Sequence, residues 1–164
     1  MVPLIVGNWK MNLDLAEAFV LSGQVAKQVE SIKGVDTVLC PPAVFIYPIN
    51  DYLKAKPSNF FLGLQNTMSQ DEGAYTGEVS LSMTKNLVRF VIIGHSERRR
   101  FFGETDEMVS QKVKYALDRK VTPILCVGEK ERFNLEEYYQ YEVKRMKEAG
   151  GILSQIKAGL KHVK

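Results

Sequence analysis

The sequence has no hydrophobic run long enough to cross a membrane, and it lacks the features of a secreted or nucleic-acid-binding protein. The N-terminal stretch MVPLIVGNWK has no basic residues ahead of its short apolar run, so we predict that it is not a signal peptide. The net charge is only +3, and no basic block is longer than the three arginines at 98–100. These absences predict a cytoplasmic protein with neither a membrane nor a nucleic-acid partner.

Cysteine is also scarce in this chain. Cys40 and Cys126 are its two cysteines, and each lies inside an apolar run. A thiol with apolar neighbours usually serves packing, and disulfides are rare in reducing compartments. We therefore predict two free thiols in the core.

No linker or low-complexity tract divides the chain, so its 164 residues predict one domain, 1–164. Within it, short and nearly continuous apolar runs recur at 3–7, 37–40, 60–64, 90–94 and 122–128. Runs without polar alternation are typical of parallel strands that are covered on both faces.

Amphipathic helical patterns separate these runs. Asp14 is a candidate N-cap for a helix to about Ile32, and Thr105 or Asp106 for another, while 44–54 and 80–87 fit short helices. Inward positions are expected at Ala18, Leu21, Val25 and Val29, at Met108, Val109, Val113, Ala116 and Leu117, and, in a third long helix, at Leu135, Tyr139, Val143 and Met146. The alternation of strands and helices predicts an α/β fold with a parallel sheet.

Polar side chains follow four of the five apolar runs. They are Asn8 and Lys10, Gln65 and Asn66, His95 to Glu97, and Glu129. Parallel α/β sheets bind ligands where the carboxyl ends of their strands meet. We therefore expect Asn8, Lys10 and His95 to be neighbours although they are far apart in the sequence.

The residue types at this edge indicate chemistry on an anionic or carbonyl substrate. Lys10 can offer positive charge to a phosphate or an oxyanion, and the alternative is a solvated lysine at the start of a loop. His95 precedes a helical turn whose N–H groups disfavour a charged ring, and a neutral imidazole can polarise a carbonyl. The alternative for His95 is a core histidine. Glu97 and the arginines at 98–100 fit a salt-bridge network or a subunit contact better than direct chemistry.

Several motifs together resemble the triosephosphate isomerase family in identity, order and spacing. They are GNWKMN at 7–12, CPP at 40–42, QN at 65–66, GAYTGEVS at 73–80, GHSERRRFFGETD at 94–106 and ILCVGE at 124–129. The resemblance covers essentially the whole chain. It implies a (β/α)8 barrel that interconverts dihydroxyacetone phosphate and D-glyceraldehyde 3-phosphate through an enediolate, in glycolysis and gluconeogenesis, with no cofactor and no metal.

The resemblance also implies roles for particular residues. Asn8 and Lys10 match substrate-binding residues, His95 matches the electrophile that polarises the carbonyl, and Ser96 and Glu97 match residues that support it.

The polar loop at 66–79 is unusually long for a compact domain, and such loops are commonly functional or contact a partner. Residues 73–79 match the loop tip that lies beside the partner's active site in family dimers. Tyr75, Thr76, Gly77 and Arg98 are therefore expected at a subunit interface.

The family barrel has eight strands in about 250 residues, whereas five are counted here. The family's catalytic glutamate follows the sixth strand in a YEPVW segment, and this sequence has no Glu-Pro pair. We therefore expect a truncated barrel of about five βα units that ends before the sixth strand, with two open strand edges, an uncovered apolar face and little or no isomerase activity. Gly150 and Gly151 follow a helical pattern and fit a helix C-cap better than a phosphate cradle.

Three hypotheses follow for such a chain. The first is an isomerase-family protein with little or no activity alone, in a homo-oligomer of at least two copies that buries the open edges. The second is one half of a split isomerase, active only with a complementing C-terminal chain. The third is a non-catalytic oligomeric scaffold, or an oligomer in which another carboxylate, Glu97 or Glu129, serves as the base.

Overall fold

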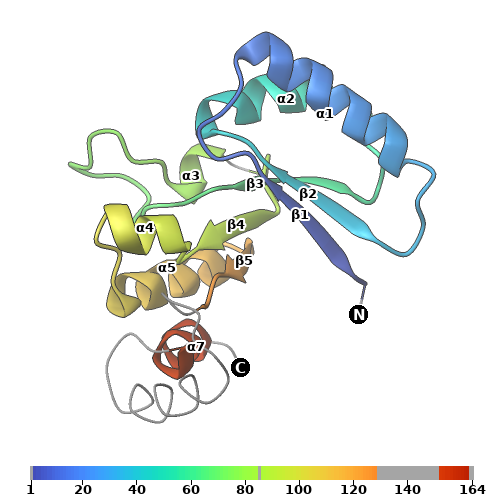
Figure 1. Ribbon diagram of the computed structural model, residues 1–164. Coiled ribbons are helices and arrows are strands. Elements are labelled where there is room, and N and C mark those ends of the chain that lie inside the picture. The colour runs from blue at the N-terminus through green and yellow to red at the C-terminus, as the bar shows by residue number, and fades with distance from the viewer. Residues whose placement is uncertain (1, 85, 129–151, 163–164) are drawn as a thin grey trace.

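The computed structural model describes residues 2–84, 86–128 and 152–162, and these residues form a curled parallel sheet with helices on its outer side (Figure 1). The strands are β1 (Leu4–Asn8), β2 (Asp36–Cys40), β3 (Phe60–Leu64), β4 (Phe90–Ile93) and β5 (Thr122–Leu125). They pair in sequence order, and every pairing is parallel. This half-barrel confirms the predicted α/β fold class.

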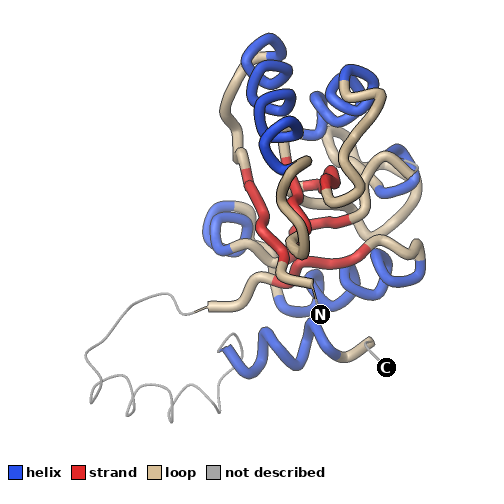
Figure 2. Tube along the Cα trace, turned by 90° about the vertical axis from the view of Figure 1, so that its right-hand side faces the viewer, coloured by secondary structure: helices blue, strands red, loops and turns tan. Residues whose placement is uncertain are grey.

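The helices cover the outer side of the sheet (Figures 1 and 2). They are α1 (Leu15–Val29), the 3-10 turn η1 (Ala43–Phe45), α2 (Ile46–Tyr52), α3 (Leu81–Thr84), α4 (Ser96–Phe101), α5 (Asp106–Asp118) and α7 (Ile152–Leu160). α5 packs on β4 and β5, and α7 packs on α5. No helix among the described residues is both long enough and apolar enough to span a membrane.

Local capping explains where the two long helices begin. The Asp14 carboxylate accepts the Glu17 N–H at 2.9 Å, and the Glu17 carboxylate accepts the Asp14 N–H at 2.9 Å, which forms a capping box. Thr105 Oγ1 accepts the Met108 N–H at 3.3 Å at the start of α5. Both predicted N-caps are confirmed, with Thr105 rather than Asp106 in that position.

Two details of the helix predictions were wrong. α1 ends at Val29 instead of continuing to about Ile32. Met108, expected inward, is 40% exposed, and α5 buries Lys112 and Tyr115, which were not expected inside. The predicted helix with Leu135 and its partners, Gly150, Gly151 and Glu129 lie outside the described residues.

The strands bury apolar side chains on both faces, which is why their sequences lack polar alternation. On the outer face, Leu39, Val91 and Ile93 pack in one cluster with residues of α1, α2 and α5. On the inner face, a second cluster contains Val38, Cys40, Phe90 and Ile92, with Val6, Phe61, Ile124 and Cys126 packed against it.

Both cysteines are free thiols, as predicted. Cys40 is buried and Cys126 is half-buried on the inner face. Burial, with a smaller contribution from Cys126, raises the pKa of the Cys40 thiol to about 12, so it is protonated at neutral pH and packs as an apolar group.

Among the described residues, the two outermost strands of the sheet are the two that the sequence predicted. In the described part of the chain, β1 and β5 each pair with a single strand. The β1 side chains Leu4 and Ile5 are 40% and 62% exposed, unlike the buried apolar side chains of β4. This part of the molecule therefore exposes strand edges and apolar surface together.

Candidate active site

Polar residues from separate strands meet at the carboxyl edge of the sheet. Asn8 ends β1, Lys10 follows it, and His95 lies two residues after β4. β1 and β4 are not neighbours in the sheet, but its curl brings the loops after them together. A hydrogen bond between them joins Lys10 Nζ to Glu97 Oε1 at 2.6 Å.

Lys10 occupies a backbone conformation that non-glycine residues rarely adopt, with φ +55°. The Asn8 Oδ1 accepts the Lys10 N–H at 3.1 Å, and Gln65 Nε2 donates to the Lys10 carbonyl at 2.9 Å. The side chain is 53% exposed. Lys10 therefore presents its ammonium at the open side of the sheet from a constrained backbone.

His95 leaves β4 through Gly94, which has φ +75°. A Cβ at Gly94 would lie 3.0 Å from Arg99 Nη2 and 3.2 Å from Val109 Cγ2, so this turn requires glycine. His95 is the N-cap of α4, and its Nδ1 accepts the Glu97 N–H at 3.3 Å. In the neutral ring that accepts this bond, the hydrogen is on Nε2, which can then donate to a ligand.

Glu97 lies close to both Lys10 and His95. Its Oε1 accepts from Lys10, and its Oε2 lies 3.6 Å from His95 Nδ1. The hydrogen bond from Lys10, together with the positive charge of Lys10, holds the pKa of the Glu97 carboxyl below its usual range although desolvation opposes this. Glu97 is therefore a carboxylate at neutral pH, and it orients Lys10.

The neighbouring arginines make ion pairs. Arg98 Nε lies 3.2 Å from Glu104 Oε1, and Arg99 Nη1 lies 2.6 Å from Asp106 Oδ1. Arg99 Nε also donates to the Gly94 carbonyl at 2.8 Å. Ser96 is the exposed first residue of α4. Of the two interpretations of the arginines, these contacts support the salt-bridge network.

Sequence reasoning missed a buried ion pair beneath this site. Lys112 Nζ donates to Glu104 Oε1 at 2.5 Å and to Asn66 Oδ1 at 2.8 Å. The Glu104 and Lys112 side chains are 1% and 4% exposed. Their identities gave no signal, because a Lys and a Glu in a helix and a loop ordinarily predict solvent-facing positions.

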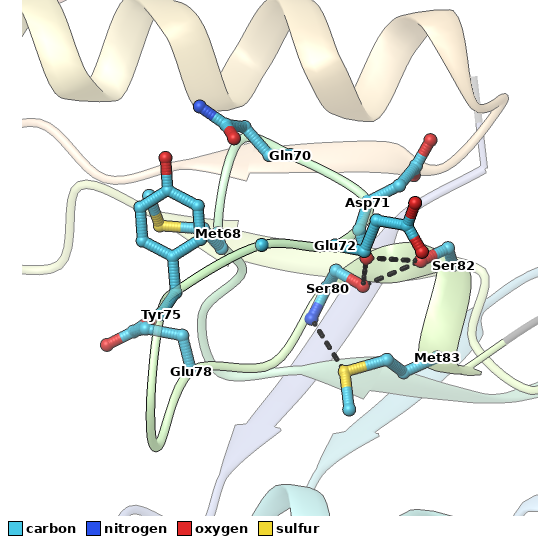
Figure 3. A pocket seen from close by; sticks show the side chains of 10 residues that line it. Met68, Gln70, Asp71, Glu72, Tyr75, Glu78, Ser80, Ser82 and Met83 are labelled. Atoms are coloured by element: carbon cyan, nitrogen blue, oxygen red, sulfur yellow. Dashed lines mark hydrogen bonds between the residues drawn. The ribbon is translucent and has the colours of Figure 1, made fainter.

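The long loop after β3 projects from the body of the molecule between β3 and α3 (Figure 1). With the start of α3 it forms an open pocket of about 460 Å³ lined by Met68, Gln70, Asp71, Glu72, Gly73, Tyr75, Glu78, Ser80, Ser82 and Met83 (Figure 3). The hydroxyls of Ser80 and Ser82 donate to the Asp71 carbonyl at 2.7 and 2.9 Å. These bonds connect the first half of the loop to the start of α3.

The expected interface residues lie in two different settings. Tyr75, Thr76 and Gly77 are exposed at the loop tip, with φ +90° at Gly77. Arg98 is largely covered by its contacts with Glu104 and with the Phe102 ring, whose centroid is 4.9 Å from its guanidinium carbon. The loop tip is thus exposed, and Arg98 contacts residues of its own chain; the interface role of all four residues stays a prediction.

Together these residues can bind an anion and stabilise negative charge on oxygen. The exposed Lys10 ammonium and the His95 ring both lie close to Glu97, and an ammonium and an imidazole N–H each suit a polarised carbonyl oxygen. Among the described residues, no group of three or more histidine, cysteine or acidic side chains is arranged to hold a metal ion.

Comparisons with known proteins identify the family of this chain. The family model for triosephosphate isomerase matches residues 3–164. The triosephosphate isomerase of Dehalococcoides mccartyi is 49% identical over 131 residues, which are 80% of this chain and 51% of that protein. That of a Thermoanaerobacter species is 43% identical over 162 residues, 98% of this chain and 60% of that protein. The chain thus spans about half to three fifths of the length of these curated relatives. It belongs to the triosephosphate isomerase family.

Proposed function

We propose that this chain supplies the electrophilic part of a triosephosphate isomerase active site, in which dihydroxyacetone phosphate and D-glyceraldehyde 3-phosphate interconvert. The observation that carries the proposal is the meeting of Lys10, from β1, with Glu97 and His95, beyond β4, at the carboxyl edge of the sheet. Membership of the family supports the choice of substrate.

The roles follow from the donors and charges. The His95 Nε2–H would donate to the substrate carbonyl, which acidifies the adjacent C–H bond. As the proton leaves carbon, charge develops on oxygen, and the Lys10 ammonium lies nearby to stabilise it. Asn8 would help bind the substrate, and Ser96 and Glu97 would support Lys10 and His95.

The base that accepts the carbon-bound proton is expected outside these 164 residues. In the family it is a glutamate after the sixth strand, and the present chain covers 51% of its Dehalococcoides mccartyi relative. Loss of a positioned base forfeits roughly 10²–10⁴-fold in rate. We therefore propose that residues 1–164 form one incomplete barrel domain that is inactive or severely impaired alone and associates with further copies of itself.

Complementation tests this proposal. The 164-residue polypeptide is assayed for isomerisation of glyceraldehyde 3-phosphate alone and with a chain carrying the last three strands of the Thermoanaerobacter relative. We expect little or no turnover alone and activity on mixing. In the mixture, His95→Ala and Lys10→Met should each lower kcat by about 10²–10⁴-fold.

Two outcomes distinguish the alternatives. Robust turnover by the polypeptide alone, abolished by His95→Ala, would show that the chain or its oligomer contains its own base. Binding of the second chain without any activity would favour the scaffold hypothesis. The open edges at β1 and β5 favour complementation, because each can accept a further strand.

A further inference from the structure

The strained backbone at Lys10 has a specific set of hydrogen bonds around it. Lys10 has φ +55°, a conformation that a long side chain adopts only where its surroundings hold it there. Asn8 Oδ1 accepts the Lys10 N–H at 3.1 Å, and Asn12 Nδ2 donates to the preceding carbonyl, that of Trp9, at 2.7 Å. Asn8 ends β1 and Asn12 lies in the loop that follows, so both amides act within one short stretch of chain and do not tie the loop to another strand.

Gln65 connects this loop to the sheet. It follows β3, two strands away from β1, and its Nε2 donates to the Lys10 carbonyl and to the Cys40 carbonyl, each at 2.9 Å. The Cys40 carbonyl also accepts the Trp9 N–H at 3.1 Å. One amide nitrogen thus uses both of its hydrogens to brace the Lys10 backbone against the end of β2.

We propose that Gln65 is a positioning residue that holds Lys10 in its left-handed conformation and so directs the ammonium to Glu97 and the substrate side of the site. The ammonium reaches Glu97 Oε1 at 2.6 Å across the sheet from β1 to α4. A relaxed Lys10 backbone would change the direction in which this side chain leaves the loop. The catalytic meaning of this placement rests on the proposed function, but the placement itself does not.

The pKa of Glu97 reports whether the Lys10 ammonium lies beside its carboxylate. The groups that face its carboxylate are Lys10 and His95, and the hydrogen bond from Lys10 is the main reason for its lowered pKa. Gln65→Met keeps the length of the side chain and removes both donors. We expect it to raise the pKa of Glu97, measured by ¹³C NMR titration of the 164-residue polypeptide and assigned with Glu97→Gln, as far as Lys10→Met does.

A double variant makes the test specific. If Gln65 acts through Lys10, Gln65→Met should produce no additional shift in a chain that already carries Lys10→Met. The proposal is overturned if Glu97 titrates as before in Gln65→Met, or if the two substitutions shift its pKa additively. Gln65→Asn, which keeps the amide on a side chain one carbon shorter, provides a milder variant should Gln65→Met not fold, and it should move the pKa in the same direction.

Asn59 provides a matched control at the opposite end of β3. Its Nδ2 donates to the carbonyls of Val29, Ile32 and Val35 at 3.1, 2.9 and 3.2 Å, so it is another amide that braces backbone from beside the sheet. Asn59→Leu should lower stability and leave the Glu97 titration unchanged. An equal shift in Asn59→Leu would mean general loosening and would overturn the proposal.

The two proposals fail separately. The Glu97 titration needs neither substrate nor a complementing chain. If Gln65→Met shifts the titration while the complemented protein has no isomerase activity, the positioning role stands and the proposed function fails. If the complemented protein is active and Gln65→Met leaves both kcat and the Glu97 titration unchanged, the positioning role fails alone.

Discussion

At the scale of single residues, the buried Glu104–Lys112 pair is the most consequential feature outside the site. It lies beneath α4, and Lys112 also binds Asn66 at the start of the long loop. Arg98 lies 3.2 Å from the same Glu104 oxygen. The Glu104–Lys112 pair thus connects α4, α5 and the long loop, so a substitution in this pair should affect all three.

Lys112→Met should destabilise the fold more than its size suggests. It leaves the buried Glu104 charge with Arg98 as its remaining cationic partner, and breaking a buried pair by removing one member costs about 3–5 kcal/mol. Urea unfolding measures the loss. The double variant Glu104→Leu with Lys112→Met should lose less than Lys112→Met alone, because no buried charge is stranded. A larger loss in the double variant would contradict this explanation.

Acid should weaken the fold through the same carboxyl group. Burial raises the pKa of Glu104, but hydrogen bonds and charge from Lys112 and Arg98 more than offset this, so the folded pKa lies below the usual range. The folded state therefore binds fewer protons than the unfolded state as pH falls. The contribution of Glu104 to the free energy of unfolding should be complete at pH values above the usual glutamate pKa. It should be lost as the pH falls towards the folded pKa. Urea unfolding at several pH values should show a shallower decline in the double variant.

At the scale of elements, a glycine in α7 allows this helix to pack closely against β5. A Cβ built on Gly159 would overlap the Leu125 side chain at the end of β5, and Gln155 Oε1 accepts the Gly128 N–H at 3.1 Å nearby. The helix can therefore approach β5 closely only because position 159 has no side chain.

Gly159→Ala should destabilise the docking of α7 despite the better helix propensity of alanine. Propensity favours alanine by about 1 kcal/mol, whereas overpacking typically costs about 1–3 kcal/mol. Hydrogen exchange of the α7 amides and urea unfolding measure the effect. In a chain that carries Leu125→Ala, the same substitution should become neutral or stabilising. Destabilisation of equal size in that background would rule out the steric explanation.

At the scale of the whole molecule, the open sheet predicts self-association. The backbone groups on the outer side of an edge strand lack strand partners and can pair with another chain. In the described part of the chain β1 is such an edge strand, and its Ile5 is 62% exposed. In sedimentation experiments, the 18.6 kDa chain should behave as a dimer or larger at micromolar concentration. Ile5→Lys, which places charge at the edge, should shift the equilibrium towards monomer.

Val20→Lys is the control for this substitution. Val20 is 59% exposed on the helix α1 rather than on an edge strand, so it gives the same change in charge at a similar exposure. It should leave the association constant unchanged. A monomeric parent chain, or an equal effect of both lysines, would refute the idea that the β1 edge drives association.

The sequence by itself determined the features that depend on near neighbours. The capping box at Asp14 and the N-cap at Thr105 act over three residues, so the sequence predicted the helix starts at Asp14 and at Thr105 or Asp106. The buried strands were readable from apolar runs, and the family from ordered motifs around Asn8, Lys10 and His95.

Only the tertiary structure decided which distant groups meet. Lys10 and Glu97 are 87 residues apart, and the curl of the sheet sets their 2.6 Å contact. The burial of Glu104 with Lys112, and the brace from Gln65 to Lys10, likewise join separate elements. From residue identity alone, a lysine or a glutamate is expected on the solvent-exposed surface. Their burial here depends on partners that are supplied by other elements, and a linear pattern carries no information about such partners.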